Sequence, residues 1–167
     1  MYNELTEVDI KKMQEELEYR DITLRAELIK NLKEAREFGD LSENAEYHLA
    51  KREKGRNESR IRYLKNMINT AKIITTNSNP NVVGIFDKVK VYFPDDDEEE
   101  VYTLSTTTRR NPDENIISKE SPLGKALMGH SVGDKILVKV SDDVSYYVEI
   151  KEITKGKDDD SLPITKF

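Results

Sequence analysis

Three acidic residues lie within seven positions of one another in the N-terminal half of the chain. They are Asp40, Glu43 and Glu46, and they fall between residues 38 and 47. Carboxylate oxygens are hard ligands that suit Mg²⁺, an ion that keeps several waters and takes one or two protein carboxylates. Chemistry on phosphodiesters commonly uses two such ions, one at the attacking oxygen and one at the leaving oxygen. This acidic stretch could therefore complete a metal site in the active centre of another molecule.

Helix capping explains the same residues without any chemistry. Asp40 is a favourable N-cap for a helix that follows it, and Glu43 three positions later would complete a capping box. Both carboxylates also favour the positive end of the helix dipole. Capping and metal binding compete for the same oxygens, so a metal function requires at least one carboxylate to turn outwards. From local sequence alone, capping is the better supported of the two interpretations.

A short basic stretch follows the acidic one. Between residues 51 and 65, seven basic residues are opposed by two acidic ones, although the whole chain carries a net charge of −6. The basic residues are Lys51, Arg52, Lys54, Arg56, Arg60, Arg62 and Lys65. A charged helix face is most often only a solvated face, and this alternative stays open. The local excess on an acidic chain favours contact with phosphates in addition.

Composition excludes several classes of protein. The chain has no cysteine, which rules out a disulfide framework and thiolate zinc sites and fits a reducing compartment. Its two histidines, His48 and His130, have no second ligand at metal spacing and are assigned to structure. No apolar run approaches the roughly 18 residues of a membrane span. We expect a cytoplasmic protein that makes no membrane contact.

Two long helices are expected to position the acidic stretch at their turn. Residues 6–38 form the first, with Thr6 as N-cap and Asp9 three positions on, and Gly39 then supplies a positive φ. The second begins near residues 40–42 and ends near residue 74. Apolar residues recur in both at spacings of three, four or seven. Because the connection is short, the helices are predicted to be antiparallel neighbours.

The apolar seam between these helices is incomplete. From residue 51 to residue 60 the second helix has no apolar residue other than Gly55. A hairpin buried in a globule would not have such a gap. The pattern predicts a finger, residues 1–74, that projects into solvent or into a channel of a partner.

The C-terminal half changes to a period of two after a polar linker at residues 75–81. Strands are predicted at residues 83–86, 88–93, 101–104, 115–118, 135–140 and 146–153. Ser121 and Pro122 open a short helix that Gly129 closes. We expect residues 82–167 to form a second domain with a mostly antiparallel sheet, one helix and a loosely ordered tail after Ile153, which makes the chain an α+β protein.

The acidic stretch and its flanks resemble a known signature. Residues 34–48, which read EAREFGDLSENAEYH, are similar to the signature of the GreA/GreB family of bacterial transcript-cleavage factors. A second block, residues 117–118 and 121–129 followed by Val132, Gly133 and Asp134, resembles the family's C-terminal domain. The resemblance runs from about residue 5 to residue 153.

The resemblance implies an antiparallel coiled coil followed by an FKBP-like lobe. In that family the lobe docks on the rim of the secondary channel of bacterial RNA polymerase, and the coiled coil enters the channel. There it stimulates the polymerase's own Mg²⁺-dependent cleavage of backtracked RNA at the 3′ end. We expect this chain to be a monomer that is not itself an enzyme.

The resemblance also implies roles for individual residues. Asp40 and Glu43 are expected to help hold a second Mg²⁺, and only in the complex with polymerase. Lys51, Arg52, Arg56 and Arg60 are expected to face the extruded RNA. The residues expected to support the tip are Gly39, Leu41, Ser42, Asn44, Glu46 and Tyr47. Phe38 departs from the family, because histidine is frequent at its position.

The sequence leaves three alternatives open. A Gre-like regulator could enter the same channel and inhibit polymerase, although such proteins tend to change the tip and this tip is intact. The lobe could be a prolyl isomerase, but it lacks tryptophan and an evident aromatic-lined pocket. A purely structural coiled-coil adaptor would not depend on Asp40.

Overall fold

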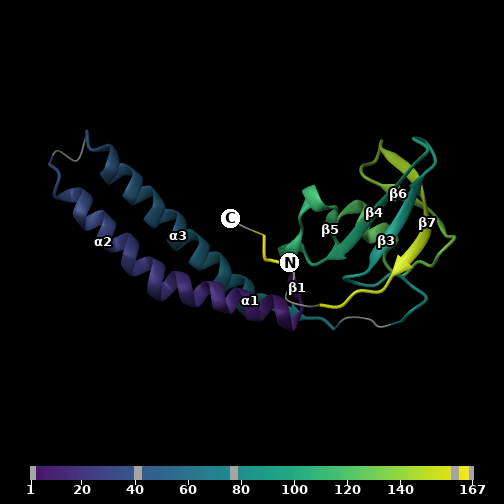
Figure 1. Cartoon of the computed structure of the whole chain (residues 1–167), viewed down its shortest axis with the longest axis horizontal. Coiled ribbons are helices and arrows are strands. Elements are labelled where there is room, and N and C mark those ends of the chain that lie inside the picture. The colour runs from purple at the N-terminus through teal and green to yellow at the C-terminus, as the bar shows by residue number, and fades with distance from the viewer. Residues whose placement is uncertain (1–2, 40–42, 76–78, 159–161, 166–167) are drawn as a thin grey trace. The chain divides into compact units, whose positions relative to one another are not determined.

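The computed structural model describes residues 3–39, 43–75, 79–158 and 162–165. The chain divides into a helical unit, Ile10–Lys72, and a β unit, Ile73–Lys166, to which Glu4–Asp9 also belong (Figure 1). The predicted finger, residues 1–74, thus includes residues 4–9, which group with the β unit. No helix within the described residues is long and apolar enough to cross a membrane.

The first arm of the helical unit is not one regular helix. It consists of α1 (Glu7–Glu18), the π-helical segment η1 (Tyr19–Leu24) and α2 (Arg25–Arg36). In η1 the backbone N–H of Arg25 donates to the carbonyl of Arg20, five residues back. That carbonyl also accepts a hydrogen bond from Asn57 Nδ2 of the second arm, at 3.1 Å. The wider turn thus occurs where a side chain of the opposite helix bonds to the backbone.

The ends of the arms agree in part with the sequence prediction. Thr6 and Asp9 form the predicted reciprocal cap of α1, with N···O distances of 3.0 and 3.2 Å. Gly39 has the predicted positive φ, at 110°. The second arm, α3 (Ala45–Thr70), begins later than predicted, because Asn44 is its N-cap.

Apolar packing in the helical unit is sparse, as the gap in the seam predicted. The buried apolar side chains of its two arms are Met13, Leu28, Ala35, Ala50, Ile61, Leu64 and Met67. Two short strands, β1 (Asn3–Leu5) and β2 (Ala71–Ile73), pair with each other. The described residues of the turn between α2 and α3 lie at the far end of the hairpin from this strand pair (Figure 1).

The β unit is built on a five-stranded mixed sheet of order β5-β4-β3-β7-β6. Its strands are β3 (Lys88–Phe93), β4 (Glu98–Ser105), β5 (Ile116–Ser118), β6 (Lys135–Lys139) and β7 (Ser145–Thr154). All neighbours are antiparallel except β4 and β5. Alternate residues such as Val89 and Val91 point into the core, where Leu127 of α4 (Pro122–Leu127) packs against them. Ser121 Oγ caps α4 by accepting from Gly124 N, as predicted.

One predicted strand, residues 83–86, is absent from the structure. Phe86 has a left-handed backbone with φ of 67°, which is incompatible with a strand. Asp87 stabilises the resulting turn, because its Oδ2 accepts from Gly84 N at 2.7 Å. The Phe86 N–H donates to Leu104 O at 2.7 Å, so the turn is fixed to β4.

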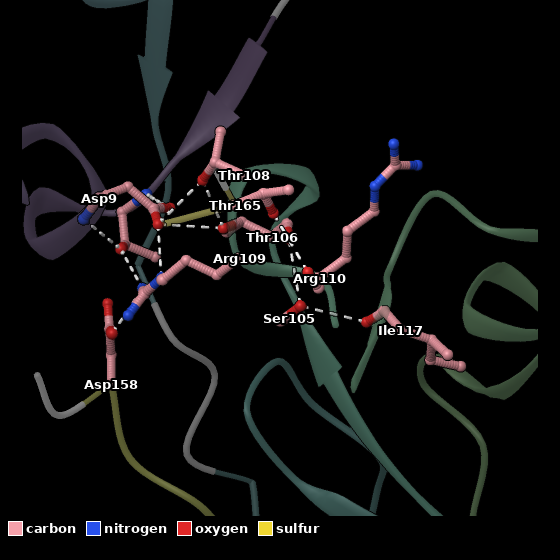
Figure 2. Close-up of polar contacts among 10 residues, drawn as sticks. Asp9, Ser105, Thr106, Thr108, Arg109, Arg110, Ile117, Asp158 and Thr165 are labelled. Carbon is pink, nitrogen blue, oxygen red and sulfur yellow. Dashed lines mark hydrogen bonds and ion pairs between the residues drawn. The ribbon is translucent and has the colours of Figure 1, made fainter. Parts of the chain in front are cut away.

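A fully buried arginine joins separate segments of the β unit. Arg109 lies at the end of η2 (Thr107–Arg109) and forms ion pairs with Asp9 at 2.6 Å and Asp158 at 2.5 Å (Figure 2). The hydroxyls of Thr106 and Thr108 each donate a hydrogen bond to Asp9 Oδ1. The guanidinium also lies over the Phe86 ring, 4.6 Å from its centre. These contacts connect the first turn of α1 and the C-terminal segment to the loop after β4.

The described part of the C-terminal segment is bound to the β unit, contrary to our expectation of a loose tail. Gly156 N donates to Asp87 Oδ1 at 3.0 Å, and Thr165 N donates to Thr108 O at 2.6 Å. A Cβ on Gly156 would lie 1.8 Å from Phe86 O, so only glycine fits there. The expectation failed because the partners of this polar segment are buried polar groups far away in the sequence.

Candidate functional site

The tip of the helical unit leaves Glu43 exposed and outside the helix cap. Asn44 caps α3: its Oδ1 accepts from Tyr47 N at 3.0 Å, and its Nδ2 donates to Ala35 O at 2.7 Å. The capping interpretation of Glu43 is therefore wrong, because the side-chain amide of Asn44, one residue later, caps α3. The carboxylate of Glu43 remains in solvent. Asp40, Leu41 and Ser42 lie outside the described residues.

The described tip suits a metal that obtains most of its ligands elsewhere. Glu43 is one exposed carboxylate, and Glu46 in the first turn of α3 is another. Among the described residues no group of three or more His, Asp and Glu side chains could hold a metal ion. Mg²⁺ accepts one or two carboxylates and keeps water or phosphate oxygens at its other positions. Such a donor set fits a shared ion and does not form a complete site.

A basic groove runs along one side of the seam between α2 and α3, next to the tip. Its volume is about 300 Å³, and its lining residues are Leu32, Arg36, Tyr47, Lys51, Lys54, Gly55 and Glu58. The Arg36 guanidinium lies 5.8 Å from the centre of the Tyr47 ring. Three cations thus line the same groove as a partly exposed aromatic ring. Groups of this kind contact phosphates and stack on unpaired bases.

The structure redistributes the basic residues that we singled out from the sequence. Lys51 lines the basic groove, whereas Arg52 and Arg56 are exposed and lie outside it. Arg60 is turned away from solvent, with its side chain 5% exposed. The groove instead gains Arg36 and Lys54. Lys54 could have been predicted, because positions 51 and 54 lie on the same face of a helix. Arg36 could not, because it belongs to the other arm and its place in the groove depends on how the two helices pair.

Arg60 forms a polar layer within the seam. Its Nε and Nη2 donate to the two carboxylate oxygens of Glu16 at 2.8 and 2.9 Å. Arg20 donates to Glu16 at 2.7 Å and to Asn57 Oδ1 at 3.2 Å. Burial acts to raise the pKa of the Glu16 carboxyl, but the hydrogen bonds and charges of Arg60 and Arg20 outweigh it and hold the pKa below its ordinary value.

A second set of ion pairs lies nearer the tip. Arg25 donates to both oxygens of Glu58 at 2.8 Å and also pairs with Asp21, which Lys65 contacts at 3.3 Å. The hydrogen bond from Arg25 holds the pKa of Glu58 below its ordinary value. Glu58 is the one acid that lines the basic groove, and Arg25 neutralises it. The groove therefore keeps the charge of its three cations.

The two polar sets explain the gap in the apolar seam. Residues 51–60 face the first arm with Asn57, Glu58 and Arg60, each bonded across the hairpin. Buried ion pairs and amides of this kind specify the register of a coiled coil at some cost in stability. The arrangement defines a two-helix finger that presents an acidic tip and a basic groove at one end.

Both halves of the chain match models of one protein family. Residues 3–73 match the N-terminal domain model of the transcription elongation factors GreA and GreB, and residues 77–155 match the C-terminal model of the same family. The finger and sheet unit thus define a transcription elongation factor. The chain belongs to the GreA/GreB family.

Similarity to known proteins extends over most of the chain. It is 43% identical over 153 residues to the transcription elongation factor GreA of Clostridium botulinum strain Langeland, covering 91% of this chain and 95% of that protein. It is 45% identical over 137 residues to GreA of Thermoanaerobacter pseudethanolicus, covering 81% and 87%. Among solved structures, one of the transcription factor Gfh1 is 27% identical and covers 93% of this chain and 99% of that one, with a TM-score of 0.45.

Proposed function

We propose that this elongation factor acts on bacterial RNA polymerase by inserting its finger into the secondary channel. There it stimulates the polymerase's own cleavage of backtracked RNA and so rescues arrested complexes. One observation carries the proposal. The exposed carboxylate of Glu43, which does not cap α3, and a groove lined by three cations occur at the same end of the finger. Among the described residues, the chain groups no three His, Asp or Glu side chains that could hold a metal ion by themselves.

The carboxylates of the tip act as auxiliary ligands in this proposal. The chemistry that a second Mg²⁺ would supply in the polymerase active centre is activation of a water for attack on the phosphodiester. Asp40 and Glu43 help to hold that ion and orient the water. Because Asn44 already caps α3, Glu43 can turn to the ion without exposing a helix end.

The basic groove binds the extruded RNA in the same complex. Arg36, Lys51 and Lys54 contact phosphates, and Tyr47 stacks on a displaced base. Arg60 is not included, because Glu16 occupies its guanidinium. The β unit docks on the rim of the channel, and the factor acts as a cytoplasmic monomer.

Cleavage of labelled RNA in a backtracked elongation complex tests the proposal. The wild type is expected to shorten the RNA only when Mg²⁺ is present. Glu43→Ala combined with Asp40→Ala is expected to bind polymerase as the wild type does and to stimulate no cleavage. Glu37→Ala, an exposed carboxylate before the turn, is the matched control and is expected to remain active.

Two outcomes would contradict this function. A wild type that slows elongation and cleaves nothing would identify an inhibitory regulator of the same channel. A wild type with no effect on polymerase would leave the family fold without the proposed activity.

A further inference from the structure

A second groove lies on the other side of the seam between α2 and α3. Its volume is about 230 Å³, and it has no basic lining residue. Its lining residues are Asn31, Glu34, Ala35, Phe38, Glu46, Leu49, Ala50 and Glu53. Three carboxylates thus border an apolar floor, and we call this surface the acidic groove.

The two grooves face opposite sides of the finger. On α2 the acidic groove uses positions 31 and 34. The basic groove uses positions 32 and 36, which lie on the other side of Ala35 at 100° per residue. On α3 the corresponding sets, 46, 49 and 53 against 47, 51 and 54, flank Ala50 in the same way. The described lining of one groove is therefore acidic and that of the other is mainly basic, and Lys30, beside the acidic groove, pairs with its Glu34 at 3.8 Å.

Among the described residues of the helical unit, the most exposed large apolar side chain lies in the acidic groove. Phe38 is 73% exposed and Leu49 is 52% exposed. Phe38 also borders the hollow at the tip that contains Glu43. Exposed apolar groups in a concave site, rimmed by charge, are typical of protein interaction surfaces. Nothing in the cap of α3 or in the polar layer requires an apolar residue at either position.

We propose that the acidic groove docks a protein element of the polymerase that carries apolar and basic side chains. This inference rests on the proposed function and adds to it a second contact of the finger. The three carboxylates repel RNA phosphates and attract lysine or arginine, and the apolar floor needs an apolar partner. RNA lies on the basic side and protein lies on the acidic side. These two contacts together fix the orientation of the finger about its long axis.

Measurements of cleavage against factor concentration, with a test variant and a control variant, test the docking. Phe38→Ser/Leu49→Ser is expected to raise the factor concentration for half-maximal cleavage about tenfold or more, because central apolar contacts dominate such interfaces. The maximal rate at saturating factor is expected to stay at the wild-type value. Ile22→Ser, which removes a 66% exposed apolar residue outside both grooves, is the matched control and is expected to change neither quantity. Helix content of all variants is compared by circular dichroism.

Photo-crosslinking distinguishes protein from RNA as the neighbour of each groove. A benzophenone amino acid in place of Leu49 is expected to capture a polymerase subunit. The same amino acid in place of Lys54 is expected to capture the labelled RNA. Capture of RNA from the Leu49 position would overturn the proposal.

The remaining outcomes separate this inference from the proposed function. If the wild type does not bind polymerase, both fail. If the wild type binds and cleaves, and the Phe38/Leu49 variant has the same half-maximal concentration, only the docking fails. If sedimentation shows that the wild type forms dimers that this variant does not form, the groove binds a second copy of the chain and the proposal is wrong.

Discussion

Arg60 and Glu16, 44 positions apart in the sequence, form a two-point ion pair that crosses the finger between its arms. The pair replaces the apolar contacts that a regular coiled coil would have at this level. Its guanidinium is 5% exposed and the carboxylate 23% exposed. A charge so placed stabilises the finger only while its partner is present.

Removal of the Arg60 charge is expected to destabilise the finger. In Arg60→Gln the carboxylate of Glu16 keeps Arg20 as a charged partner. Loss of two charge-assisted hydrogen bonds at a partly buried site is expected to cost about 2 kcal/mol. Urea unfolding followed by circular dichroism measures the change. Arg62→Gln, whose exposed guanidinium contacts Ser59, is the control; an equal loss in both variants would contradict the buried pair.

The same ion pair makes the stability of the finger depend on pH in the acidic range. The pKa of Glu16 is lower in the folded chain than its ordinary value of 4.5. Its contribution is therefore present above 4.5 and is lost as the pH falls through the lower folded pKa. The difference in unfolding free energy between wild type and Glu16→Gln is expected to shrink over that acidic range. A difference that stays constant with pH would show that the carboxylate is not held ionised.

Asn57 is expected to fix the register of the two arms. It bonds both the backbone carbonyl and the side chain of Arg20 in the π-helical segment. Asn57→Ala should cost about 1–2 kcal/mol, since each bond contributes roughly 1 kcal/mol. Asn57→Leu replaces the amide by an apolar group, and we expect it to keep helix content but lose the single register.

Spin labels measure the register directly, because the chain has no cysteine of its own. Cysteines introduced at Lys33 and Arg52, both exposed, place one label on each arm. A single narrow distance distribution is expected for the wild-type background and a broad or doubled one with Asn57→Leu. Identical narrow distributions would show that the turn alone sets the register.

The sequence was informative where local pattern decides the structure. The caps formed by Thr6 with Asp9 and by Ser121 with Pro122 depend on neighbours a few residues away, and they were predicted correctly. The two helical arms were predicted in part, because η1 interrupts the first arm and α3 begins at Ala45. The π-helical turn and the burial of Arg60 depend on partners in the opposite arm, which local periodicity does not contain. Asn44 was missed as the cap because Asp40 and Glu43 matched the same motif. The site prediction for Asp40 and Glu43 came from resemblance and stays a prediction.

The buried pair of Asp9 and Arg109 is expected to be a principal source of stability in the β unit. Neither side chain is exposed, so Asp9→Asn leaves a buried guanidinium with Asp158 as its acidic partner among the described residues. The expected cost is about 3–5 kcal/mol. Asp158→Asn is expected to cost less, because Asp158 is partly exposed and Asp9 remains. Hydrogen exchange of amides in β3, β4 and β7 measures both, and equal effects would contradict this ranking.

The response of cleavage to salt is expected to identify the cations that contact RNA. Each phosphate contact to a single strand contributes about 0.7 to the slope of log affinity against log salt, so Lys51→Gln/Lys54→Gln should reduce that slope by about 1.4. Arg52→Gln/Arg56→Gln removes two exposed charges outside the basic groove and serves as the matched control. The measurement is the factor concentration for half-maximal cleavage over a series of salt concentrations. If the control pair carries the salt dependence, the RNA follows the outer face of α3, as the sequence alone suggested, and the groove does not bind it.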